Sequence, residues 1–223
     1  MNSRFEIWRK QNPNLSYENF EVKLGEMSAS GSLFDFAKLD NVSKKIIKSM
    51  TDEQVFNEIK NWAKKYSKNL LDIIEKDEKR FANSIAIWHK NRMDIAKWSE
   101  IETLFKYLYD ENFANCVEYE DLSNFKNVKD ILTDFVKSYD DKVEEQVWFE
   151  NMKQICEKYN YATNMKEFKE APEKFTGSVV DATAFLRVAL TGKKDSPNIY
   201  QIMHFVGKGE TLKRVQKLTA NVQ

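Results

Sequence analysis

Glycine and proline are scarce in this sequence, and their scarcity is the strongest constraint on its fold. The chain of 223 residues contains only 6 glycines and 3 prolines. Sheet-rich proteins need many tight turns, which these residues favour, so helices joined by short polar connections are the better expectation. The 15 phenylalanines, 9 tyrosines and 5 tryptophans can fill the wide spaces between such helices. We therefore predict an all-α protein with a substantial core.

Apolar residues recur at helical spacing through most of the chain. Thr51 with Gln54, and Ser99 with Glu102, have the spacing of capping boxes, and each pair predicts the start of a helix. The acidic region Val117–Asp130 has no strong apolar face at its start, and we expect a connector or domain boundary near 115–127. Helices are expected at 33–50, 70–74, 81–88 and about 128–138, 141–159, 164–170 and 179–190.

Charge is balanced overall but unevenly distributed. The formal net charge is zero. From Glu100 to Glu157 there are 6 Lys+Arg against 15 Asp+Glu, whereas from Phe185 to Gln223 there are 7 against 2. Such local excess of positive charge can bind a polyanion although the sum is zero.

Sequence signals of catalysis and metal binding are absent. Cys116 and Cys156 are too few for a disulfide framework or a zinc site, and we expect both to be small buried residues in a reducing cytoplasm. We expect His204 to be packed or half-exposed on an apolar helix face. For His89 a surface position is favoured, with a phosphate contact as the alternative. The chain has no nucleophile elbow and no glycine-rich phosphate loop.

No signal peptide is visible, and no apolar run approaches the roughly 18 residues of a membrane span. We therefore expect a cytoplasmic protein.

Two basic segments are candidates for binding nucleic acid. In the first, Arg80–Trp98, cations alternate with aromatic residues that could stack on unpaired bases, although Trp88 and Trp98 could equally be core residues. The second, Phe185–Leu218, has a basic turn between helices. Within that turn Ser196 reads as the N-cap of the following helix and Pro197 as its first residue.

Four ordered blocks of this sequence resemble bacterial glutamyl-tRNA synthetases. The most specific is LRVALTGKKDSPNIYQIMHFVGKGETLKRVQKL (Leu186–Leu218), which is similar to the C-terminal end of that family. The others are SASGSLFDFAKL (Ser28–Leu39), RMDIAKWSEI (Arg92–Ile101) and KEFKEAPEKFTG before VVDATAFLRVA. The family's catalytic motifs, of the His-Ile-Gly-His and Lys-Met-Ser-Lys-Ser types, do not occur in the sequence.

The resemblance implies a helical cage of two all-helical subdomains, preceded by a short irregular or helical end of the stem-contact region. The expected divisions are 1–50 for the stem-contact end, 51–120 for the first anticodon-binding subdomain and 121–223 for the second.

The resemblance also implies which residues contact tRNA. Those expected to read anticodon bases are Arg187, Ser196, Pro197 and Ile199, with Arg92 at the first anticodon base. Those that could neutralise phosphates are Lys193, Lys194, Lys213 and Arg214. Solvated surface is the alternative for the lysines, and helix packing against a buried partner is the alternative for Arg187.

By this resemblance the chain is the tRNA anticodon-binding module of a class I glutamate–tRNA ligase, without its ATP-binding catalytic domain. We expect it to be a monomer that is inactive alone, and to have as partners the anticodon arm of glutamate tRNA and the N-terminal catalytic domain of the full-length protein. We expect no cofactor here, since ATP and magnesium serve the catalytic domain. The alternative is a helical protein-interaction adaptor derived from such a domain, with the acidic middle as its partner surface.

Overall fold

The computed structural model describes residues 3–21, 23, 35–89, 95–109 and 113–222, and most of them are helical. The prediction of an all-α fold is confirmed. The strands of the described residues form one small parallel pair, in which β1 (Tyr161–Ala162) lies beside β2 (Gly177–Ser178).

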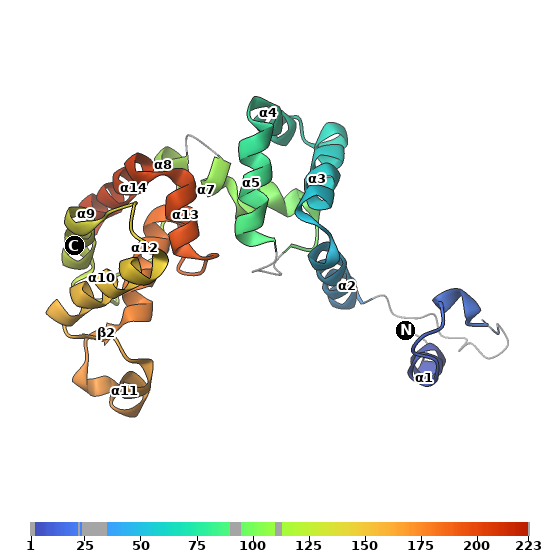
Figure 1. The fold of residues 1–223 in the computed structure, drawn as a ribbon, viewed down its shortest axis with the longest axis horizontal. Helices are drawn as coiled ribbons and strands as arrows, with labels where there is room; N and C mark the ends of the chain where they lie inside the picture. Colours follow the sequence, from blue (N-terminus) through green and yellow to red (C-terminus); the bar gives the residue numbers. More distant parts are fainter. Residues whose placement is uncertain (1–2, 22, 24–34, 90–94, 110–112, 223) are drawn as a thin grey trace. The chain divides into compact units, whose positions relative to one another are not determined.

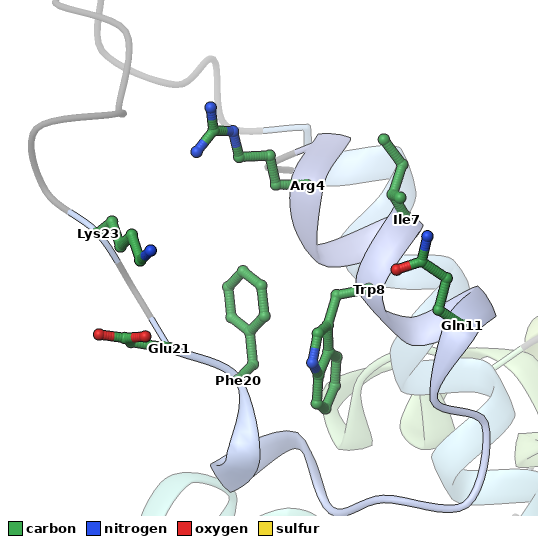
Figure 2. A pocket seen from close by; sticks show the side chains of 7 residues that line it. All are labelled: Arg4, Ile7, Trp8, Gln11, Phe20, Glu21 and Lys23. Atoms are coloured by element: carbon green, nitrogen blue, oxygen red, sulfur yellow. The ribbon is translucent and has the colours of Figure 1, made fainter.

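The chain forms two compact units, Met1–Asn41 and Val42–Gln223. The first contains α1 (Ser3–Gln11) and a short 3-10 helix, Tyr17–Asn19. Phe20 packs against Trp8 of α1 with 5.4 Å between the ring centroids. Figure 2 shows these two rings side by side in a small pocket of about 240 Å³.

Helices make up most of the second unit, and α2 (Phe36–Ser49) leads into it. The helices of its first half are α3 (Asp52–Tyr66), α4 (Lys68–Lys76), α5 (Glu78–Trp88), the 3-10 turn Trp98–Glu100, α6 (Ile101–Leu104), α7 (Lys106–Tyr109) and α8 (Phe113–Cys116). Those of its second half are α9 (Val128–Ser138), α10 (Glu145–Lys158), α11 (Met165–Glu170), the 3-10 turn Pro172–Lys174, α12 (Val179–Thr191), α13 (Ile199–Val206) and α14 (Lys208–Asn221).

Helices α3, α4 and α5 pack against one another and bury Ile59, Leu70 and Ile85 (Figure 1). The predicted capping box at the start of α3 is confirmed, because the N–H of Gln54 donates to Oγ1 of Thr51 and the N–H of Thr51 donates to Oε1 of Gln54. These two bonds satisfy amides that the helix itself leaves unpaired.

The second predicted capping box, Ser99 with Glu102, is wrong. Lys97 occupies the N-cap position of that turn, and the carboxylate of Glu100 accepts its N–H at 3.1 Å. Glu102 instead accepts hydrogen bonds from the side chains of Ser67 and Asn69. A tertiary contact thus takes the carboxylate that a local motif would have used.

Helix α12 is the centre of the second half, because α9, α10, α13 and α14 all contact it. Its residues are buried on nearly every side, as expected for a helix that is apolar all round. The Ser178 hydroxyl and the Asp181 carboxylate cap its first turn. Arg187 is carried on this rigid central helix.

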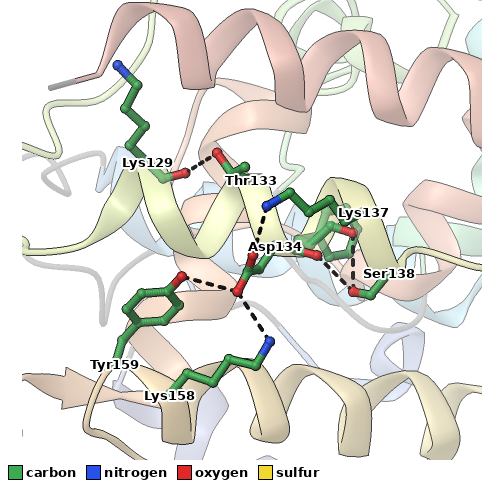
Figure 3. A network of polar contacts seen from close by, with 8 residues as sticks. Lys129, Thr133, Asp134, Lys137, Ser138, Lys158 and Tyr159 are labelled. Atoms are coloured by element: carbon green, nitrogen blue, oxygen red, sulfur yellow. Dashed lines mark hydrogen bonds and ion pairs between the residues drawn. The ribbon is translucent and has the colours of Figure 1, made fainter.

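A polar network ties α9 to the end of α10, as Figure 3 shows. The Asp134 carboxylate accepts hydrogen bonds from Nζ of Lys158 at 3.3 Å and from the Tyr159 hydroxyl at 3.1 Å. Burial alone would raise the pKa of Asp134. The hydrogen bonds and the nearby positive charge of Lys158 together outweigh this effect, so the pKa of Asp134 lies below its ordinary value. The network therefore holds a charged carboxylate between the two helices.

The connector was predicted at 115–127, but α8 extends to Cys116, so the segment without a helix, which we call the connector, is 117–127. It joins α8 to α9. The subdomain limits at residues 50 and 120 stay a prediction.

Candidate nucleic-acid interface

The turn between α12 and α13, residues 192–198, is the basic turn of this protein. Helix α12 ends at Thr191, and its C-cap residue is Gly192, whose φ of 81° is in the left-handed region. A Cβ at this position would lie only 2.8 Å from the backbone oxygen of Glu118. Glycine is therefore required both by the backbone conformation and by the close approach of the connector.

Helix α13 does not begin where the sequence predicted. The predicted cap at Ser196 with Pro197 as the first helical residue is wrong, because Asn198 is the N-cap and accepts the N–H of Gln201 through its side chain at 3.2 Å. The Ser196 hydroxyl donates instead to the backbone oxygen of Pro197. Asn198 also donates to the Glu145 carboxylate at 2.7 Å, which joins the start of α13 to the start of α10.

The four residues expected to read bases lie on one continuous stretch of the chain. Arg187 is half-buried near the end of α12, and Ser196 is half-buried in the basic turn. Pro197 and Ile199 are buried. Arg187 and Ser196 are therefore the more exposed residues of this set, although Nη1 of Arg187 is itself buried.

Glu120 of the connector holds the basic turn through three contacts. Its backbone N–H donates to the oxygen of Gly192 at 2.9 Å. Its Oε2 accepts the backbone N–H of Lys194 at 2.7 Å. Its Oε1 lies 3.6 Å from Nζ of Lys193. One carboxylate therefore engages both the backbone and a side chain of the turn.

Lys194 makes a further contact with the connector, since its Nζ lies 5.3 Å from the centre of the Phe125 ring. Hydrogen bonds from the backbone N–H and hydroxyl of Ser123 lower the pKa of Asp121, and the nearby charge of Lys194 acts in the same direction. The acidic connector and the basic turn thus lie against each other.

Lys213 and Arg214 of α14 differ from each other in exposure. Lys213 is exposed and pairs with Glu210 at 3.5 Å. The guanidinium of Arg214 is buried, with a relative exposure of 3%. Its Nη1 donates to the backbone oxygens of Tyr107 at 2.9 Å and Leu190 at 3.0 Å. We therefore assign Arg214 a structural role that joins the two halves of the unit, and leave it out of the proposed tRNA surface.

The first basic segment, Arg80–Trp98, is only partly described, and Arg92 lies outside the described residues. Trp88 is a core residue and stacks on Phe105 with 4.7 Å between ring centroids. The prediction of a surface position for His89 is wrong. This residue is buried, with Nδ1 2.6 Å from the Asp52 carboxylate and Nε2 2.7 Å from the oxygen of Ile47.

His204 is exposed on α13 and lies against the Tyr200 ring, with 4.0 Å between ring centroids. Among the residues that the structure describes, no group of histidine, cysteine and carboxylate side chains could hold a metal ion. None of the helices in the described ranges is both long enough and apolar enough to cross a membrane.

The sequence did not point to Glu120, although it did carry a signal. The run Glu118–Asp121 holds three carboxylates and the basic turn holds Lys193 and Lys194, so opposite charge could have suggested their contact. The two lie 74 positions apart, which is beyond the reach of any local pattern.

Comparison with known proteins identifies the family. A model of the anticodon binding domain matches residues 54–219, which include α12, the basic turn and the connector. The chain belongs to this family of anticodon-binding domains.

The relatives that it matches are glutamate–tRNA ligases. Those of Clostridium perfringens strain SM101, Acetivibrio thermocellus and Sorangium cellulosum are 36%, 32% and 28% identical to it. The matches cover 99%, 98% and 97% of this chain, but 41%, 40% and 39% of the respective relatives. The chain thus spans about two fifths of the length of these relatives. The resemblance to the C-terminal half of bacterial glutamyl-tRNA synthetases is confirmed.

Proposed function

We propose that this chain binds the anticodon arm of a glutamate tRNA, as the anticodon-binding module of a class I glutamate–tRNA ligase in the cytoplasm. The observation that carries the proposal is the family match over residues 54–219, which contains the basic turn beside Arg187. Aminoacylation, with its ATP and magnesium, belongs in this proposal to the catalytic domain of the full-length protein. The module itself works as a monomer.

Two kinds of contact follow from the positions of the residues. Unpaired anticodon bases expose their Watson–Crick edges, which an arginine or a backbone group can read directly. Arg187 and the backbone of Ser196, Pro197 and Ile199 take this role, and Arg92 takes it for the first base. Lys193, Lys194 and Lys213 bind phosphates, a contribution that weakens as salt is raised.

A binding titration tests the base-reading part. The chain of 223 residues is titrated into labelled tRNA with the glutamate anticodon, and into the same tRNA with a scrambled anticodon. Arg187→Ala should weaken binding of the first tRNA roughly fivefold to 150-fold, corresponding to a loss of about 1–3 kcal/mol of base recognition. Arg187→Lys keeps the charge but loses the planar fork, so it should recover little of this loss. Circular dichroism checks that each variant is folded.

The phosphate part is tested by the salt dependence of the same titration. The slope of log affinity against log salt is negative. Each of Lys193→Ala and Lys194→Ala should make it less steep by about 0.7, the contribution of one phosphate contact to a single strand. Lys137→Ala removes an exposed lysine of α9 outside the basic turn and should leave the slope unchanged. Equal affinity for the two anticodons, or for wild type and Arg187→Ala, would count against tRNA reading. Protein partners that persist after nuclease treatment would then favour the adaptor function.

A further inference from the structure

We propose that Glu120 is a positioning residue for anticodon recognition: it holds the basic turn in its reading conformation from the connector. The inference rests on the proposed function, because it assigns to Glu120 the shape of the surface that meets the anticodon. Glu120 itself need not touch RNA.

The geometry of the three contacts supports this role. The N–H of Glu120 donates to Gly192 at 2.9 Å, and its Oε2 accepts from the N–H of Lys194 at 2.7 Å, so the turn is bound on both sides of Lys193. These two hydrogen bonds fix the backbone of the turn from Gly192 to Lys194. A short bond from an amide to a carboxylate is among the stronger hydrogen bonds in proteins.

Close packing of Gly192 against the backbone of the connector also holds the basic turn in place. The connector approaches this glycine so closely that a Cβ would lie 2.8 Å from the oxygen of Glu118 and 2.9 Å from Cγ2 of Val117. The turn therefore rests against the connector backbone as well as on the Glu120 side chain. Removing the carboxylate releases one side of the turn while this backbone contact persists.

Charge gives Glu120 a second effect of opposite sign. Its Oε1 lies 3.6 Å from Nζ of Lys193, whose side chain is 69% exposed. In the free protein this carboxylate partly neutralises a cation that phosphates would also attract. Positioning by Glu120 improves recognition of the anticodon, whereas its charge lowers the general affinity for RNA.

Three variants separate the two effects. Glu120→Gln can still accept the N–H of Lys194 but loses the charge. Glu120→Ala loses both the hydrogen bond to Lys194 and the charge. Glu118→Ala is the matched control, because Glu118 is an exposed carboxylate of the same connector and its removal changes the net charge as Glu120→Ala does.

The first measurement is amide hydrogen exchange of the RNA-free protein. Exchange at Lys194 should become about tenfold faster in Glu120→Ala, because the amide loses its side-chain acceptor altogether. The increase should be smaller in Glu120→Gln, which keeps a neutral hydrogen bond, and exchange should change little in Glu118→Ala. Unchanged exchange in Glu120→Ala would overturn the positioning role. This result does not depend on any RNA.

The second measurement is the ratio of affinities for matched and scrambled anticodons. Glu120→Ala should lower this ratio about fivefold to tenfold, because a loosened turn no longer presents the reading groups. Glu120→Gln should keep the ratio and bind both tRNAs slightly better. If Glu120→Ala and Glu118→Ala act alike, the effect is one of charge alone and the inference is wrong. If the wild type shows no preference between the two anticodons, the proposed function fails, while hydrogen exchange still decides whether Glu120 holds the turn.

Discussion

The buried guanidinium of Arg214 offers the sharpest test of how the two halves of the second unit are joined. Its Nη1 donates to the oxygens of Tyr107 and Leu190, and its Nε donates to Glu210 at 2.8 Å. The perturbation is Arg214→Met, which keeps most of the aliphatic packing and removes the charged fork.

The expected loss follows from those contacts. Hydrogen bonds that involve a charged group contribute roughly 1.5–3 kcal/mol each, and removal of one partner leaves buried carbonyls unsatisfied. The Glu210 bond adds less, because the Glu210 side chain is 26% exposed. We expect the free energy of unfolding to fall by about 3–5 kcal/mol, the loss usual when a buried charged partner is removed. In a chain of this size that lowers the midpoint of thermal unfolding by roughly 6–20 °C.

Urea unfolding followed by circular dichroism measures the loss, with Lys213→Ala as the control. Lys213 is the exposed neighbour of Arg214 on α14, and its ion pair with Glu210 should contribute no more than about 0.5 kcal/mol. A loss below about 1 kcal/mol for Arg214→Met would refute the structural role. If that small loss came with weaker, less salt-dependent tRNA binding, Arg214 would be a phosphate contact.

Four further changes, at Gly192, Gly209, Thr51 and Cys156, have directions set by the structure. Gly192→Ala should destabilise the protein by more than about 1 kcal/mol, because the φ is positive and the oxygen of Glu118 is in the way. Gly209→Ala, a helical position with open space around it, should instead stabilise by up to about 1 kcal/mol in the same melting assay. Thr51→Ala removes the side-chain half of a capping box and should cost about 1 kcal/mol in urea unfolding, whereas Thr51→Ser should cost far less. Burial raises the pKa of the Cys156 thiol to about 12. Because the thiol of the unfolded chain ionises near its ordinary pKa of 9.0, the stability that burial of the neutral thiol provides should be fully present below pH 9 and lost progressively up to pH 12. In Cys156→Ala this loss of stability with rising pH should be smaller.

Local patterns were sufficient to predict most helices. The helix predicted at about 128–138 is α9. The helix predicted at 179–190 is α12, which extends one residue further, to Thr191. In both, apolar residues at helical spacing face the core, so local sequence and tertiary packing agree. The connector was predicted for the complementary reason, the lack of such a face.

The errors arose where a distant partner decides the local structure. His89 is buried because Asp52 and Ile47, 37 and 42 positions earlier, take both of its ring nitrogens. Arg214 is buried because an oxygen 107 positions away accepts from it. At the start of α13 two capping residues stand close together, and the bond from Asn198 to Glu145 of α10 favours the second. Such contacts leave no periodic trace in the sequence.

The position of α14 in the chain has a consequence for folding during synthesis. This helix packs against α9, α12 and α13, all of which precede it, and it brings Arg214 to the oxygen of Tyr107. A ribosome adds about 5–20 residues per second, and α14 ends 83 residues after α9, so α14 is completed roughly 4–17 s after α9. Until α14 follows, the apolar faces that it will cover stay open to water. We expect the core of the second half to be completed only when α14 has been added, in a single late step.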